Sequence, residues 1–204
     1  MNTISELQDV TGLNISVNGN GNLIASEGEK DDNGNLRGSE EARSMFMHSI
    51  GDKKNTAFVS LSSKGKSYVG NSKGEGEVGG NQIFLSREEI SSFKRGAMGV
   101  DNRTMGYGIV FLHETLHSNV AEGGGQSDIG GWNHNQSVNR GPVVDRMNIV
   151  RRQMNAKGFN FGERSTYYMR SYIYQGQTVN TRENLIGFIL HLCLMVCIWG
   201  LKYK

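Results

Sequence analysis

Apolar residues recur at helical spacing in the middle of the chain, over residues 105–120, MGYGIVFLHETLHSNV. The apolar positions, three and four residues apart, are Ile109, Leu112, Leu116 and Val120. Residues at this spacing share one face of an α-helix, so the pattern predicts a helix with a buried face. Glu122 and the three glycines that follow it are expected to end this helix.

Capping and turn residues predict three more helices. Ser39, followed by two glutamates, is typical of a helix N-cap and opens a helix that ends near Gly51. The sequence Ser-Arg-Glu-Glu from Ser86 onward forms a capping box at the start of a short helix. Pro142 suits the first turn of a further helix, which is predicted to continue over residues 143–155.

Short β-type runs separated by glycine-rich turns predict most of the remaining structure. Residues 14–26 contain two such runs around an Asn-Gly-Asn-Gly turn, the pattern of a β-hairpin. Residues 56–62 and 82–85 are strand candidates on either side of a glycine-rich stretch, residues 65–80, which is expected to form a long hairpin or a flap. The aromatic-rich residues 159–180 also favour β-structure.

A second apolar stretch lies at the end of the chain. Residues 185–201, LIGFILHLCLMVCIWGL, are broken only by His191 and are followed by lysines. A membrane-spanning helix needs about 17 to 25 apolar residues, so the stretch reaches the lower limit. Two interpretations stay open: an apolar C-terminal helix that anchors the chain in a membrane with its lysines on the cytoplasmic side, or an aberrant tail from an altered reading frame.

Composition narrows the function without assigning one. The chain has 204 residues, 28 of them glycine and one proline, enough for one domain with a sizeable core and many turns. Its 22 basic and 20 acidic residues give a formal charge of +2, so no attraction to nucleic acid is expected. Cys193 and Cys197 lie inside the apolar stretch and form no disulfide framework, and the N-terminus has no signal-peptide pattern.

The helix predicted over residues 105–120 carries a His-Glu-x-x-His motif formed by His113, Glu114 and His117. Histidines four residues apart project from the same helix face, so both imidazoles can bind one zinc ion at about 2.0 to 2.1 Å. Glu114 lies at the edge of that face, where it can act as general base on a zinc-activated water and pass the proton to a leaving amine. The motif therefore predicts a zinc-dependent metallopeptidase, a hydrolase of peptide bonds.

A catalytic zinc needs a third protein ligand, for which the sequence offers several candidates. The glycine-and-histidine continuation of the elongated motif is absent, because Gly123 stands where its histidine would be. Asp145, on the second helix, is the first choice, since zinc peptidases often take a carboxylate from a helix packed behind the first. Asp128 and His134, in a glycine-rich loop, are the alternatives, while Glu122 lies too close to the first helix to turn back.

Other residues are expected to complete the site. Asn148, three residues after Asp145, could orient the ligand carboxylate, although a surface position suits it equally. A substrate chain would add to an edge strand, for which residues 82–85 are the expected place. An oxyanion could be stabilised by Arg164, Tyr167, Tyr168 or Tyr172.

Together, the motif and its flanking elements predict an α+β, zincin-like fold, with a small sheet and hairpins beside the active-site helix and a second helix packed against it. The expected domain covers residues 1–180, with a strand-rich part over 1–100 and the active-site helices over 101–158. The apolar segment 185–201 follows it. The competing hypothesis is a non-catalytic, zinc-stabilised interaction module, in which four protein ligands close the metal.

Five segments of the chain resemble the C-terminal toxin domains of bacterial Rhs-repeat proteins, a group of polymorphic toxins. They are residues 11–24, 102–118, 123–128, 141–154 and 161–168, and the His-Glu-x-x-His motif is the specific part. The resemblance implies a zinc metallopeptidase effector, delivered as the tail of a larger secreted protein and neutralised in the producing cell by an immunity partner. By position it makes His113 and His117 zinc ligands, Glu114 the catalytic base, and Asp128 and Asp145 sources of the third ligand.

Three features depart from that family's pattern. The chain begins with its own methionine and contains no Rhs repeats, its sequence turns apolar after Gly187, and its loop around His134, GGWNHNQSVNRG, is longer. The resemblance and these departures together imply a bacterial protein that is an exported toxin or is derived from one. Its association with a membrane depends on residues 185–201.

Overall fold

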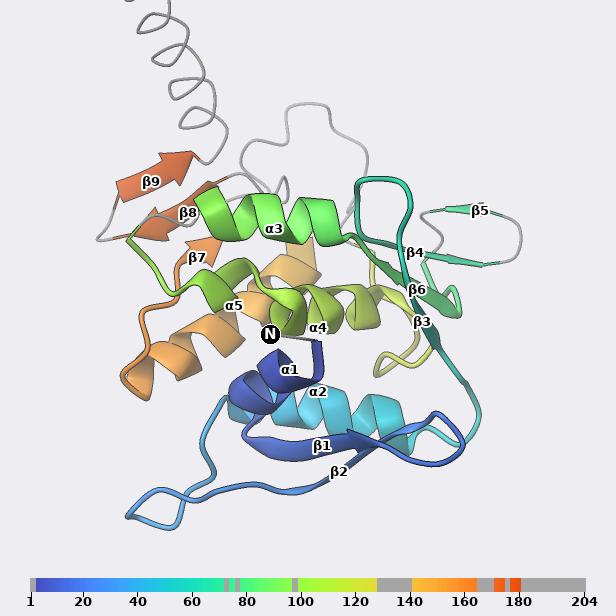
Figure 1. Ribbon diagram of the computed structural model, residues 1–204, viewed down its shortest axis with the longest axis horizontal. Helices are drawn as coiled ribbons and strands as arrows, with labels where there is room; N and C mark the ends of the chain where they lie inside the picture. Colours follow the sequence, from blue (N-terminus) through green and yellow to red (C-terminus); the bar gives the residue numbers. More distant parts are fainter. Residues whose placement is uncertain are drawn as a thin grey trace, which may run out of the picture.

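The computed structural model describes residues 3–71, 74–75, 78–96, 99–127, 141–164, 171–174 and 177–180. Within these ranges the fold is mixed α+β, which confirms the predicted class (Figure 1). The helices are α1 (Thr3–Thr11), α2 (Glu40–Gly51), α3 (Arg87–Gly96), the 3-10 helix η1 (Asn102–Met105), α4 (Tyr107–His117) and α5 (Gly141–Ala156). The strands are β1 (Leu13–Val17), β2 (Leu23–Glu27), β3 (Phe58–Leu61), β4 (Tyr68–Asn71), β5 (Gly74–Glu75), β6 (Gln82–Leu85), β7 (Glu163–Arg164), β8 (Ser171–Tyr174) and β9 (Gln177–Asn180).

Helix α4 lies in the middle of the molecule and packs against α1, α2, α5 and strands β4 and β6 (Figure 1). Residues 108–116 are all buried, because neighbouring elements cover the helix on every side rather than on one face. Its apolar side chains join those of α1, α2 and α5 in one core, where the ring centroids of Phe46 and Phe111 are 6.3 Å apart. Dense packing on all sides makes α4 a rigid support for its polar side chains.

Three small sheets accompany the helices. Strands β1 and β2 form the antiparallel hairpin predicted over residues 14–26, with Val17 opposite Leu23. The four-stranded sheet has the order β3-β6-β4-β5, in which β3 is parallel to β6 and β4 is antiparallel to both of its neighbours. The third sheet, of order β7-β8-β9, supplies the β-structure expected within residues 159–180.

Strand β6 is a central strand, so the expectation that residues 82–85 form a free edge is wrong. The strand pairs with β3 on one side and with β4 on the other, which leaves no open side for a substrate chain. Ile83 and Leu85 are buried, as suits a central strand. Strands β3 and β5 are the edges of this sheet, and all four residues of β3 are exposed.

Helix α4 ends at His117, earlier than the glycine stop predicted from the sequence. Ser118 adopts an extended backbone, and its hydroxyl donates to a carbonyl one turn back at 2.7 Å. The N–H of Gly79 donates to the carbonyl of His117 at 2.7 Å, and the N–H of Asn119 donates to the carbonyl of Gly80 at 2.9 Å. Pairing with the chain that leads into β6 therefore ends the helix, and apolar periodicity does not report such a long-range contact.

The predicted helix starts are confirmed. The Ser39 hydroxyl accepts the N–H of Ala42 at 3.1 Å at the start of α2, and the Ser86 hydroxyl accepts the N–H of Glu89 at 3.1 Å in α3. Helix α5 begins at Gly141. Helix α1 was not predicted, because its nine residues are few and include β-branched residues with low helix propensity. Its packing against α4 and β1 stabilises it instead.

No helix in the described ranges is both long enough and apolar enough to cross a membrane. The apolar segment 185–201, with the anchor or C-terminal helix predicted there, lies outside the described residues.

Candidate metal centre

His113 and His117 lie one turn apart on α4 with their Nε2 atoms 3.3 Å from each other. Two nitrogens bound at about 2.0 to 2.1 Å to one tetrahedral zinc ion lie about 3.3 to 3.4 Å apart. The two rings meet edge to face, with centroids 4.9 Å apart. The pair therefore has the spacing that a shared zinc ion requires.

The backbone carbonyl of Gln126 orients the His117 ring. Its oxygen lies 2.6 Å from Nδ1, and because a carbonyl only accepts, Nδ1 carries the proton. The lone pair of neutral His117 is then on Nε2, which faces His113. If Nε2 of His113 carries a proton, it donates to the lone pair of His117. If Nε2 of His113 carries a lone pair instead, two lone pairs face each other, and a cation bound between them would stabilise this second arrangement. Gln126 is itself held by its N–H, which donates to the carbonyl of Leu116 at 2.8 Å.

His113 is only 6% exposed, which decides its charge state. Burial, and after it the positive charges of Arg164, His117 and Arg151, hold the pKa of the His113 imidazole well below its usual value of 6.5. The ring is therefore neutral near pH 7. Neutral imidazole is the form that binds metal ions.

Glu114, the predicted base, is also only 6% exposed. Because successive helical residues are about 100° apart, its side chain leaves α4 at the edge of the His113 face. Glutamate is rarely buried unless its carboxylate has a specific use, since desolvation of a charge is costly. The burial of Glu114 argues against the solvated surface charge expected if the motif had arisen by chance.

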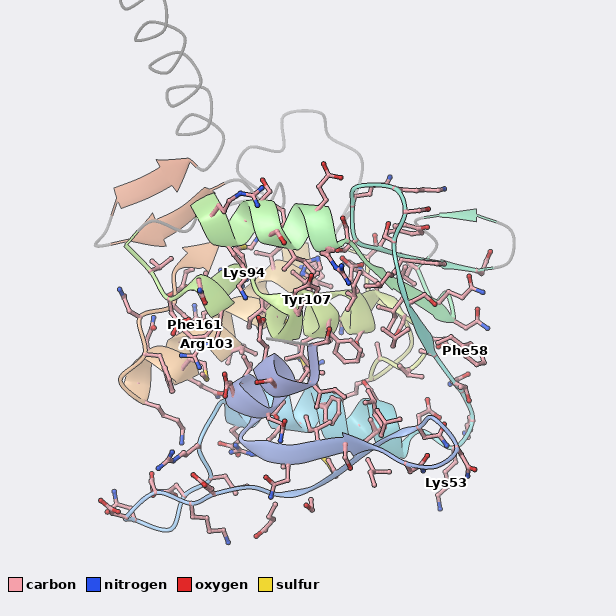
Figure 2. The ribbon with its side chains drawn as sticks, in the orientation of Figure 1. Lys53, Phe58, Lys94, Arg103, Tyr107 and Phe161 are labelled. Carbon is pink, nitrogen blue, oxygen red and sulfur yellow. The ribbon has the colours of Figure 1, made fainter. Side chains whose placement is uncertain are left out.

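Helix α1 supports the start of α4 through Glu6, a residue that no sequence pattern singled out. Glu6 is fully buried and accepts the N–H of Gly108 at 3.3 Å, while the N-cap of α4, Gly106, has no side chain for this role. Lys94 reaches from α3 to the same carboxylate at 2.6 Å (Figure 2). A Cβ on Gly108 would lie 2.8 Å from the Glu6 backbone, so the close approach of α1 requires glycine there.

Helix α5 holds strand β7 through the side chain of Asn148. Its amide donates to the carbonyl of Arg164 at 2.8 Å, and its oxygen accepts the N–H of Arg164 at 2.9 Å. Nη1 of Arg151 donates to the same oxygen at 3.2 Å. Asn148 is therefore a buried residue that positions backbone, and its interpretation as a surface residue is wrong. These hydrogen bonds were not expected from the sequence, and the contact of Asn148 with a ligand carboxylate stays a prediction.

Two buried guanidinium groups lie close enough to His113 to lower the pKa of its imidazole. Arg151 and Arg164 are each 1% exposed, and both contribute to the lowered pKa of His113. Burial, and then the charge of Arg164, lower the pKa of Arg151 to about 9. The positive potential of these groups favours negatively charged side chains at the site. Arg164 was a predicted oxyanion partner, whereas the sequence did not single out Arg151.

The structure brings His113 and His117 together without Asp145. Asp145 is exposed near the start of α5, and the described residues contain no group of three His, Cys, Asp or Glu side chains that could hold a metal ion. The alternative third ligands, Asp128 and His134, lie outside the described residues. The assignment of the third ligand therefore stays a prediction.

The remaining candidates are placed as follows. Glu122 accepts a hydrogen bond from Arg146 of α5 at 3.1 Å, which agrees with the expectation that it does not turn back to the metal. Tyr167 and Tyr168 lie outside the described residues, and only the backbone of Tyr172, in β8, is described.

Comparisons of the chain with protein-family models, with curated proteins and with solved structures found no match. The function of the site is therefore inferred from its own residues.

Proposed function

We propose that the chain is a zinc-dependent endopeptidase of zincin-like fold, with His113 and His117 as zinc ligands. The observation that carries the proposal is the 3.3 Å separation of their Nε2 atoms. The Gln126 carbonyl supports it, because histidines that bind metals usually donate their other N–H to a carbonyl or carboxylate. A buried glutamate directly beside the first histidine supplies the base that hydrolysis needs.

When bound, zinc would lower the pKa of a water molecule towards about 7 and polarise a peptide carbonyl. Glu114 accepts the proton from the attacking water and passes it to the leaving nitrogen. The water oxygen bonds to the carbonyl carbon and the C–N bond breaks, so the products are a carboxylic acid and an amine, and near pH 7 the proton of the acid passes to the amine or to solvent. Because α4 is buried on all sides, His113, Glu114 and His117 keep their relative positions during these steps.

The resemblance to Rhs-associated toxin domains supports a bacterial toxin or effector that is exported, cleaves a target protein and is countered by an immunity partner. Association with a membrane through residues 185–201 belongs to the same proposal. The alternative is a non-catalytic interaction module in which four protein ligands close the zinc. The position of Glu114 directly beside the first histidine favours the enzyme, because hydrolysis needs a base next to the metal and a closed site does not.

A metal titration tests the histidine pair. The purified chain is expected to bind one zinc ion, and His117→Ala is expected to weaken that binding by at least about a hundredfold, because it removes a direct ligand. Zinc content and competition with a chromophoric chelator measure the affinity. His48→Ala is the matched control, since His48 is exposed on α2 and should leave the affinity unchanged. Equal affinity of the wild-type chain and the His117 variant would refute the metal site.

A comparison of three alanine variants identifies the third ligand. The prediction from the sequence is that Asp145→Ala lowers zinc affinity more than Asp128→Ala or His134→Ala. The structure leaves Asp145 exposed and apart from the histidine pair, so its carboxylate would have to move to reach the metal. A carboxylate is favoured because it offsets the two buried guanidinium groups near His113. The largest loss in the Asp128 or the His134 variant would transfer the assignment to that residue, and only the His134 result would also contradict the charge argument.

A further inference from the structure

Three segments of the chain meet at the C-terminal end of α4, beside His117. The N–H of Gly79 donates to the carbonyl of His117 at 2.7 Å, and the N–H of Gln126 donates to the carbonyl of Leu116 at 2.8 Å. The carbonyl oxygen of Gln126 lies 2.6 Å from Nδ1 of His117. The segments around Gly79 and Gln126 therefore both attach to the last turn of this helix through their backbone atoms.

Gly125 lies directly against the hydrogen bond between Gly79 and His117. A Cβ built on Gly125 would lie 2.2 Å from the nitrogen of Gly79 and 2.2 Å from the oxygen of His117, the two atoms that this bond joins. It would also lie 2.8 Å from Cα of Gly79. Non-bonded carbon atoms pack best at about 3.5 to 4.0 Å, and all three neighbours are backbone atoms that cannot rotate away. The close approach of the two segments therefore requires glycine at position 125.

The two preceding glycines, Gly123 and Gly124, have a different role. Their φ angles are +80° and +81°, in the left-handed region that favours glycine, whereas Gly125 lies outside that region. Among the described residues, no heavy atom lies within 4 Å of a Cβ built on Gly123 or Gly124. These two glycines therefore form the turn after α4, and Gly125 allows the chain that leaves this turn to contact the helix end.

A side chain at position 125 would move the segment that carries Gln126. On the other side of the contact Gly79 is fixed, because the next residue accepts the N–H of Asn119 at 2.9 Å and strand β6 begins soon after it. The turn of residues 122–124 is exposed, so it can yield more easily.

Such a displacement would release the His117 ring. Relief of a 2.2 Å contact takes a shift of about 1 Å. Directed away from α4, this shift would lengthen the contact between the Gln126 oxygen and Nδ1 from 2.6 Å to about 3.6 Å, beyond the range of a hydrogen bond. The ring proton would then no longer be fixed on Nδ1, and the lone pair would no longer be fixed on Nε2, where a shared zinc ion needs it.

We propose that Gly125 is a positioning residue of the metal centre: because it has no side chain, the Gln126 carbonyl reaches His117 and keeps the Nε2 lone pair of this ring directed at the metal. The inference rests on the proposed zinc site for its function. The state of the His117 ring can nevertheless be measured without metal, so the two proposals can fail separately.

The position of the His117 ring proton tests the proposal on the full chain. Nitrogen–proton correlation spectra of the imidazole, recorded without metal at a pH at which the ring is neutral, are expected to show the proton on Nδ1 in the wild-type chain. Gly125→Ala should lose this preference and bind zinc about tenfold to a hundredfold more weakly, the usual effect of removing a partner that orients a metal ligand. A proton on Nε2 in the wild-type chain would overturn the proposal, and so would an unchanged ring or an unchanged zinc affinity in Gly125→Ala. If the wild-type chain binds no zinc but Gly125→Ala still alters the ring, the zinc site fails and the positioning of His117 stands.

Two further variants separate positioning from a general loss of stability. Gly124→Ala strains the same turn at a positive φ without a close contact, so it should lower the melting temperature but leave the ring and the zinc affinity unchanged. If Gly124→Ala releases the ring as much as Gly125→Ala does, the proposal fails. Gln126→Pro removes the N–H that holds this residue to Leu116, so it should also release the ring. It takes the place of Gly125→Ala if that variant does not fold, and an unchanged ring would then overturn the proposal.

Discussion

Glu114→Gln is expected to abolish most peptide hydrolysis while leaving one zinc ion bound per chain. In the proposed mechanism Glu114 moves a proton and does not bind the metal, so glutamine keeps the shape of the side chain but cannot act as a base. General base catalysis contributes about 100-fold to 10,000-fold to such rates, and the loss should fall in that range. Cleavage of a mixed library of synthetic peptides, followed by the release of new amino termini, measures it.

The matched control for this variant is Glu122→Gln. Glu122 lies on the same stretch of chain, is exposed and contacts Arg146, so hydrolysis should stay close to the wild-type rate. Toxicity of each variant when produced in bacterial cells gives a second readout. If the Glu114 variant keeps zinc and hydrolyses peptides at the wild-type rate, Glu114 is not the base and the proposed mechanism fails. If the wild-type chain itself binds zinc and releases no new amino termini, the zinc-stabilised interaction module takes the place of the peptidase. Loss of zinc together with activity would instead make Glu114 a metal ligand.

The predictions from sequence succeeded where the signal is local. Ser39 and Ser86 cap the helices that follow them, and the Asn-Gly turn joins β1 to β2 as predicted. They failed where distant segments decide the structure. The end of α4 at His117 depends on pairing with Gly79 and Gly80, and the position of β6 inside its sheet depends on strand order. Neither the helix end nor the strand order produces a periodic pattern of apolar residues in the sequence.

The same division applies to the candidate site. His113, Glu114 and His117 are close in sequence, and one helical turn is enough to predict their relative positions. The groups that set the orientation and the charge of these side chains come from other parts of the chain. The Gln126 carbonyl, which orients His117, lies after the end of α4. Arg164, which lowers the pKa of His113, lies near the site because Asn148 of α5 holds its backbone. Such partners depend on tertiary packing, so no motif could have identified them.

Glu6 offers the clearest test of how the fold positions the active-site helix. Glu6→Ala is expected to lower the free energy of unfolding by about 3 kcal/mol, because it removes a buried partner of Lys94 and the carboxylate that caps α4 at Gly108. Glu6→Gln should cost less, since its amide oxygen can still accept the Gly108 N–H. Denaturant unfolding measures both, with Glu40→Ala at an exposed helix start as the control, expected within about 0.5 kcal/mol of wild type. If the Glu6 variants are as stable as Glu40→Ala, the start of α4 is held by apolar packing and not by the Glu6 carboxylate. In that case zinc affinity should be the same in Glu6→Ala, Glu6→Gln and Glu40→Ala.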